Sequence, residues 1–251
     1  MNRLLRIRLQ TTAAQDEQLR ALQRAFVEVC NALSPLAQQS GVWSRVGLHQ
    51  LGYHRMRQRF PGLGSQMVCN AIYSVSRACR LVYQHPSSPF SVRRIGHAAL
   101  PRLHFGADAP VYFDRHTLSL KDGLASMYTL DGRIRFNLPL EKQDERRFLE
   151  HRLLEIALAR GNDGLALTFI FGDAPDASAG EQRDVLGPGD DAAAASAEPG
   201  DDKLPLPNYL RIIDTPASAD AVLPIVDEPS PQCSRGALSK SASTPRASAR
   251  H

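Results

Sequence analysis

Hydrophobic and polar side chains alternate near the start of the chain, from Leu5 to Gln10. Leu5, Ile7 and Leu9 fall on one side of an extended backbone, and Arg6 and Arg8 fall on the other. A period of two is typical of a strand with one buried face. The pattern therefore predicts a strand over residues 3–10.

The period changes after Thr12, and three helices are expected before residue 85. Thr12 and Gln15 have the spacing of a capping box, in which both side chains satisfy backbone N–H groups at a helix start. This first helix is predicted over 13–33, and Pro35 is expected to end it or to begin a new turn. A second helix is predicted over 46–60, with apolar positions at Leu48, Leu51, Tyr53, Met56 and Phe60.

The third predicted helix has the clearest two-sided pattern, with Ser65 as its cap and its end near Tyr83. One arc of the helix is apolar and contains Val68, Ala71, Ile72, Val75, Cys79 and Val82. The opposite arc is polar and contains Asn70, Tyr73, Ser74, Arg77 and Arg80. We expect this helix to bury the apolar arc and to present the polar, cationic arc to solvent.

From about residue 110 the period is again two, which predicts an antiparallel sheet or small barrel over 107–173. Asp131-Gly132 and the segment 161–164 (Gly-Asn-Asp-Gly) are hairpin signals, and 141–150 is expected to be helical. After residue 173 the chain is rich in Ala, Asp, Ser, Pro and Gly, so 174–251 is predicted to be mostly disordered. An apolar island at 204–226 is the part of this tail that is expected to dock, as a strand.

Charge is distributed very unevenly along the 251 residues. Residues 1–106 contain 14 arginines, no lysine and three acidic residues, a net charge of +11, whereas 107–173 carry −2 and 174–251 carry −5. A strongly basic segment favours a polyanionic partner, RNA or DNA. Arginine guanidinium groups bind phosphates in a bidentate geometry. The residues expected to contact nucleic acid are Arg55, Arg57, Arg59, Asn70, Arg77, Arg80, Arg93, Arg94 and Arg102.

Other classes of function lack their sequence signatures. No Ser–His–Asp pattern, phosphate-binding loop or dinucleotide fingerprint occurs, and the spacing of the histidines and four cysteines does not match a metal site. We therefore expect no catalytic residues, metal or cofactor. The basic N-terminus does not resemble a signal peptide, and no stretch has the ~20 apolar residues of a membrane span, so a cytoplasmic protein is predicted.

Five segments, in the same order, resemble the TnpB (OrfB-like) proteins of insertion sequences. They cover about residues 3–172. The first segment, Leu9-Gln-Thr-Thr-Ala-Ala-Gln15, is similar to the strand and helix start of that family, and the second is Cys30-Asn31-Ala32. The third segment, 48–68, is similar to the family pattern Y-x-x-I/L-R-x-x-F-x-L-x-S/A-Q-x. The fourth, 111–120, is similar to Y-D-x-R-x-L-S, and the fifth, 130–133, is similar to L-E-G-R.

The resemblance implies an α+β fold in which a helical recognition domain is inserted into a wedge-type antiparallel β-barrel. The barrel would comprise residues 1–11 and 86–173, and the insert 12–85. TnpB proteins are RNA-guided nucleases whose RNase H-like domain begins with V/I-G-x-D-x-G. Here the nearest segment, 185–190, has Pro188 and Gly189 in place of the metal-binding pattern.

We therefore expect a nucleic-acid-binding protein that does not cleave its ligand, with RNA or DNA as partner and no membrane. Two alternatives remain open. In the first alternative, the chain is one part of a split nuclease and a separate chain supplies catalysis. In the second, it is a decayed transposon fragment without a selected role.

Overall fold

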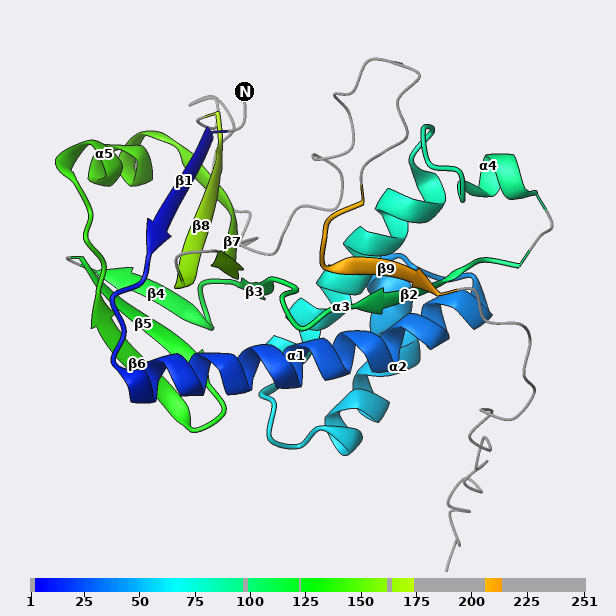
Figure 1. Cartoon of the computed structure of the whole chain (residues 1–251), viewed down its shortest axis with the longest axis horizontal. Helices are drawn as coiled ribbons and strands as arrows, with labels where there is room; N and C mark the ends of the chain where they lie inside the picture. The colour runs from blue at the N-terminus through cyan, green and yellow to red at the C-terminus, as the bar shows by residue number, and fades with distance from the viewer. Residues whose placement is uncertain (1–2, 97–98, 122, 162–163, 174–205, 214–251) are drawn as a thin grey trace, which may run out of the picture. The chain divides into compact units, whose positions relative to one another are not determined.

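Helices and antiparallel sheets together make up the fold, as the sequence predicts. In a computed structural model of the chain, the structure describes residues 3–96, 99–121, 123–161, 164–173 and 206–213. Most of the tail that is predicted to be disordered, and the ends of its apolar island, lie outside these residues. The first strand precedes all the large helices, and the other strands follow them (Figure 1).

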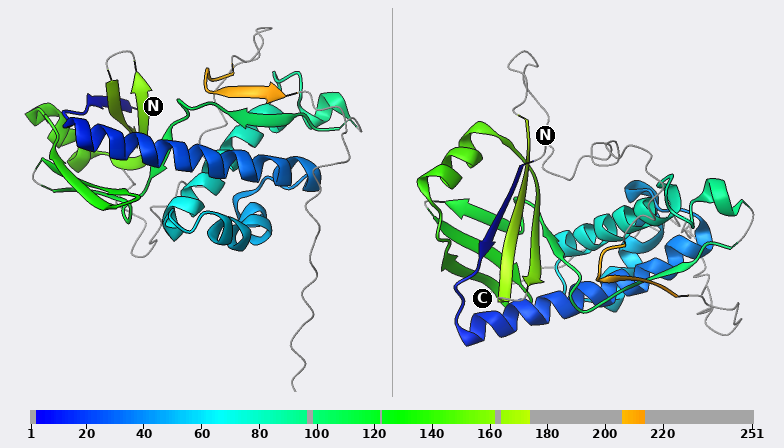
Figure 2. Two further views of the ribbon diagram at one scale, coloured as in Figure 1. Left: turned by 60° about the horizontal axis from the view of Figure 1, so that its bottom comes forward. Right: turned by 45° about the horizontal axis from the view of Figure 1, so that its top comes forward.

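The largest sheet brings the two ends of residues 3–173 together. Alternation along β1 places Leu5 and Ile7 on the buried side of this sheet, where Phe169 and Phe171 are also buried. In both views of Figure 2, β1 lies beside β8. The sheet contains, in spatial order, β1 (Arg3–Arg8), β8 (Gly164–Gly172), β7 (Arg152–Gly161) and β3 (Val111–Phe113).

A second sheet forms where the hairpin signals predict it. Asp131-Gly132 closes a hairpin, and Gly132 has a φ of 106°, a conformation that favours glycine. The other predicted hairpin joins β7 to β8, with Gly161 opposite Gly164. The second sheet contains β4 (Leu118–Lys121), β5 (Leu124–Thr129) and β6 (Gly132–Asn137).

The described strands form antiparallel sheets that do not close into a barrel, so the wedge-type barrel stays a prediction. Closure requires every strand to pair on both edges, but β1, β3, β4 and β6 each pair with one described strand. A cleft of about 640 Å³ separates β4 from β7. A second cleft, of about 760 Å³, lies between β1 and the residues after β6.

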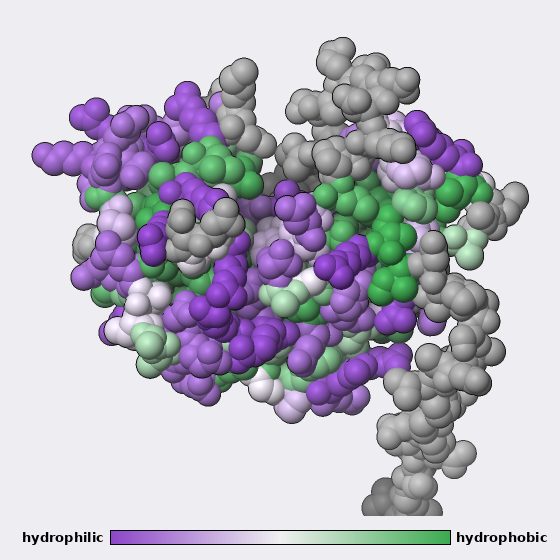
Figure 3. All heavy atoms as spheres, in the orientation of Figure 1, coloured by the Kyte–Doolittle hydropathy of each residue, from purple (hydrophilic) through white to green (hydrophobic). Residues whose placement is uncertain are grey.

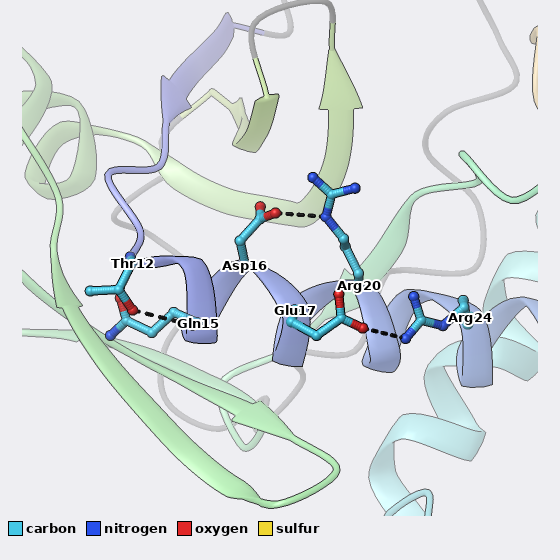
Figure 4. A network of polar contacts seen from close by, with 6 residues as sticks. All are labelled: Thr12, Gln15, Asp16, Glu17, Arg20 and Arg24. Carbon is cyan, nitrogen blue, oxygen red and sulfur yellow. Dashed lines mark hydrogen bonds and ion pairs between the residues drawn. The ribbon is translucent and has the colours of Figure 1, made fainter.

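The first helix is longer than predicted. The capping box at Thr12 and Gln15 is confirmed (Figure 4), but α1 (Ala13–Ser40) continues through Pro35. Packing outweighs the lost backbone hydrogen bond, because Leu33 and Ala37 on either side of the proline are fully buried. The remaining helical elements are α2 (Arg45–Arg59), α3 (Ser65–Cys79), the π-helical turn η1 (Arg80–Gln84), α4 (Val92–Ile95) and α5 (Lys142–Glu150).

Side chains of α1 replace a neighbouring strand along β2 (Arg102–Phe105). The Asn31 amide donates to the Phe105 carbonyl at 2.9 Å and accepts from the Phe105 N–H at 2.8 Å. The Ser34 hydroxyl donates to the Leu103 carbonyl at 2.6 Å, and the Gln38 amide donates to the Leu100 carbonyl at 2.7 Å. These polar groups on α1 satisfy backbone groups that a sheet neighbour would otherwise satisfy.

The other edge of β2 pairs with β9 (Leu210–Ile213). This confirms that the apolar island contains a strand that docks on the fold. Leu210 is buried, and hydrophobic side chains gather over β9 and β2 on the face seen in Figure 3. Strand β2 lies in the range expected for the barrel, 86–173, but it pairs with β9 and contacts α1 instead.

Candidate nucleic-acid interface

Helix α2 packs on the rest of the protein through a narrow stripe. The Ser44 hydroxyl caps its start by accepting from the Gly47 N–H at 3.1 Å. Leu48 and Met56 are buried, and Gly52 lies between them on the same side. A Cβ at Gly52 would lie 2.6 Å from Cδ2 of Leu33, so glycine is what permits the close approach of α1. Most of the α2 surface is therefore left outside the core.

This stripe corrects part of the predicted apolar face of α2. Leu51 is 49% exposed and lies outside the core, whereas Tyr53 and Phe60 are half-buried and pack against the core as predicted. The buried positions recur every four residues, and a glycine takes the middle one. The sequence signal for this close helix packing is Gly52 with an apolar residue four positions before it and another four positions after it. A search for hydrophobic positions alone misses this signal, because glycine does not count as hydrophobic.

Two flanks of α2 differ in chemistry. We call Val46, His49 and Tyr53 the aromatic flank, because their spacing of three and four places them on one side. The rings of His49 and Tyr53 are stacked, with centroids 4.5 Å apart and an angle of 14° between their planes. His54 meets Tyr53 edge-on at 5.3 Å and extends the ring system along the helix.

The other flank carries arginines, and we call Leu51, Arg55 and Arg59 the arginine flank. Both arginines are exposed, and neither forms an ion pair with another described residue. The guanidinium group of Arg59 lies 5.3 Å from the centroid of the Phe60 ring. Arg57 follows Tyr53 by four residues, and its guanidinium group donates to the Leu63 carbonyl and holds the turn after α2.

The remaining predicted arginines occupy three different environments. Arg93 and Arg94 are exposed on the short helix α4. Arg80 is half-buried, and its guanidinium group donates to the Ser76 hydroxyl at 3.4 Å. Arg102 is half-buried on β2. The exposed members of the predicted set are therefore Arg55, Arg59, Arg93 and Arg94.

The uncharged residues of the polar arc of α3 are buried and its two arginines are half-buried, which corrects the expectation that the whole arc faces solvent. Strand β3 covers it, and Asn70, only 3% exposed, donates to the Tyr112 carbonyl at 3.1 Å. Tyr73 is also buried, and its hydroxyl donates to the Glu155 carboxylate at 2.7 Å. The periodicity of α3 identifies its polar arc but not a β-strand that supplies polar partners to it.

Arg77, which is half-buried, is bonded to the same cluster. Its guanidinium group donates to the Glu155 carboxylate, and to the Tyr112 hydroxyl at 3.3 Å. Burial alone would lower the pKa of Arg77, but Tyr112 and Glu155 raise it above its ordinary value. Burial, together with the nearby Glu155 carboxylate, raises the pKa of Tyr73. Asn70 and Arg77 thus join α3 to the large sheet.

Replacing Arg77 is expected to lower stability and to leave nucleic-acid affinity unchanged. In Arg77→Met the Glu155 carboxylate, 12% exposed, keeps only Tyr73 as a donor, so the free energy of unfolding should fall by about 1–3 kcal/mol. The double variant Arg77→Met/Glu155→Leu removes the unpaired charge and should recover part of this loss. Urea unfolding of the two variants measures the difference, and equal losses in both would contradict the assigned role.

Two of the three acidic residues of the first 106 positions lie near the start of α1, and the third, Glu28, lies in the middle of this helix. Asp16 pairs with Arg20 at 2.6 Å, and Glu17 pairs with Arg24 at 2.7 Å (Figure 4). From Glu28 to Asp108 the chain contains no other Asp or Glu. Hydrophilic side chains follow α1 on the face seen in Figure 3. The exposed arginines on α2 and α4 therefore belong to a stretch without carboxylates of its own.

Neither cleft between the sheets brings together a recognisable catalytic set. The cleft beside β4 is lined mainly by apolar side chains, including Leu118, Phe148 and Leu153. The carboxylate of Glu155 at this cleft is already bound by Tyr73 and Arg77. Among the described residues, no three or more His, Cys, Asp or Glu side chains gather closely enough to hold a metal ion. No helix in this part of the chain has the length and apolar character of a membrane span.

Comparison with known proteins adds no family assignment. No protein-family model matches the chain, and no curated protein matches it significantly.

Proposed function

We propose that the protein binds RNA or DNA through its arginine-rich helical part and does not cleave it. The observation that carries the proposal is the exposure of Arg55, Arg59, Arg93 and Arg94 in a stretch without acidic residues. Phosphate groups are the common anions that arginine guanidinium groups bind best. Exposed arginines without neighbouring carboxylates keep their full charge for such a partner.

The proposal includes a wedge-type fold of the TnpB kind, with the helices as an inserted recognition domain. In its support, β1 precedes the helices and pairs with β8, which follows them. The chain thus leaves the large sheet after its first strand and returns to it. The absence of a TnpB-type nuclease signature in the sequence is the reason for proposing binding without cleavage.

Salt dependence of binding tests this function. Binding that neutralises phosphates releases counterions, so the affinity of the full chain for RNA or duplex DNA should fall linearly on a log–log plot against salt. Engagement of the four exposed arginines predicts a slope of magnitude about 3–4 on duplex DNA. Fluorescence anisotropy over a range of potassium chloride concentrations measures it. A flat dependence, or no binding at low salt, would contradict the proposal.

A further inference from the structure

The outer surface of α2 combines stacked rings with cations that form no ion pair with another described residue. The aromatic flank places the His49 ring on the Tyr53 ring, and His49 is exposed to solvent. The arginine flank, with Arg55 and Arg59, lies across the exposed face of the same helix. Since α2 is held by the narrow stripe of Leu48, Gly52 and Met56, both flanks are accessible together.

Exposed apolar residues accompany each flank. Val46 is 63% exposed beside the stacked rings, and Leu51 is 49% exposed beside Arg55. In a helix whose only function is to cover the core, large apolar side chains are usually turned inward. Their exposure beside rings and cations marks a surface for a ligand that has both flat apolar faces and negative charges.

We propose that α2 is a platform for single-stranded nucleic acid, with bases stacked along the aromatic flank and phosphates bound by the arginine flank. This inference rests on the proposed function and specifies its ligand and its contact surface. An aromatic ring stacks on a base only where the face of that base is free, which is the case in a single strand and not inside a duplex. Stacking is tolerant of sequence because every base has such a face.

The charge of the surface matches this ligand. No acidic residue occurs in α2 or in its neighbour α3. The exposed arginines of α2 lie on one flank and its stacked rings on the other, so a strand that lies along the helix can direct its bases to one flank and its backbone to the other. A duplex offers backbone on its whole outer surface and gains nothing from the ring system.

The test compares single strands with a duplex of equal length, about 15 nucleotides. Labelled oligo-U, oligo-dT and a DNA duplex are titrated with the full-length protein, and binding is measured by fluorescence anisotropy. We expect tighter binding to both single strands than to the duplex. Comparison of oligo-U with oligo-dT distinguishes RNA from DNA as the preferred ligand, and either preference agrees with the platform.

Ring substitutions locate the contact. His49→Leu and Tyr53→Leu should each weaken single-strand binding by about five-fold or more, and duplex binding should change less. Tyr53→Phe retains the ring and should bind like the unchanged protein. His116→Leu, at an exposed histidine outside the basic segment, is the matched control and should have no effect. His49 is exposed, so its variant remains informative if Tyr53→Leu fails to fold.

The possible failures can be told apart. Equal or tighter binding of the duplex, or ring variants with unchanged single-strand affinity, would overturn the platform while nucleic-acid binding itself stands. If no oligonucleotide binds at low salt, the proposed function fails, and the platform fails with it.

Discussion

The free energy of unfolding is expected to fall steeply as the pH rises above 9. Burial raises the pKa of the Cys30 and Cys79 thiols from an ordinary value of 9.0 to about 12, and both side chains are fully buried. The unfolded chain loses these protons near pH 9, whereas the folded chain keeps them to about pH 12. Stability is therefore complete below pH 9 and is lost between those two values.

The size of this effect follows from the shift. Between pH 9 and 12 each thiol lowers the free energy of unfolding by about 1.4 kcal/mol per pH unit. The two thiols together therefore lower it by about 5 kcal/mol at pH 11. Above about pH 10 the tyrosines add to the loss, because burial also raises the pKa of Tyr73, Tyr83, Tyr112 and Tyr209. A loss of this size equals the whole stability of many domains.

Urea unfolding at a series of pH values from 8 to about 11 measures the loss. In Cys30→Ala/Cys79→Ala the slope between pH 9 and 10 should become smaller by about 2 kcal/mol per pH unit. The comparison is between the slopes of unfolding free energy against pH in the two proteins. The small cavities left by the substitutions lower stability equally at every pH and do not change these slopes. The same slope in both proteins would show that the thiols are not buried as described.

Replacing Asn31 is expected to be among the most damaging single changes in the helical part. Asn31→Leu removes both partners of the Phe105 backbone, the donor to its carbonyl and the acceptor for its N–H. Because Phe105 is buried, unpaired backbone groups there should cost roughly 2–4 kcal/mol in total. Asn31 also joins α1 to β2, so the loss should extend to the pairing of β2 with β9.

Two measurements distinguish this role from a general weakening of α1. The midpoint of urea unfolding should fall for Asn31→Leu but not for Gln39→Leu, an exposed position on the same helix where the change should stay within about 0.5 kcal/mol. Amide hydrogen exchange of Phe105 should become much faster in Asn31→Leu. An unchanged exchange rate would mean that the Asn31 amide does not hold the strand.

Local signals in the sequence locate most elements correctly. The capping box at Thr12 sets the start of α1, and Asp131-Gly132 sets the turn between β5 and β6. The short strand at Val111–Phe113 lies within 107–173, the range that the sequence predicts to form sheet. Each of these features is stabilised by interactions between residues that are close in sequence. A short stretch of sequence is therefore enough to predict it.

Features that depend on distant residues escape the same approach. The polar arc of α3 looks like a surface, but Tyr112 and Glu155, far along the chain, supply its hydrogen-bond partners. Helix α1 passes Pro35 because its flanking residues are buried by other elements. The predicted arginines differ in the same way: Arg55 and Arg59 are exposed and form no ion pair with a described residue, whereas Glu155 binds Arg77, whose side chain is 41% exposed.

Charge-matched variants give the most direct test of nucleic-acid binding by the basic segment. The first variant replaces Arg55, Arg59, Arg93 and Arg94 by Gln. The second replaces four exposed arginines outside that segment, Arg135, Arg146, Arg152 and Arg160, and so changes the net charge equally. For each, the slope of log affinity against log salt is measured on one RNA and one DNA duplex.

The account predicts that the first variant loses most of its affinity at moderate salt and that its slope on the DNA duplex becomes smaller by about 3–4. The second variant should keep an affinity and a slope close to those of the unchanged protein. If the second variant loses as much affinity as the first, or more, the basic segment is not the binding surface.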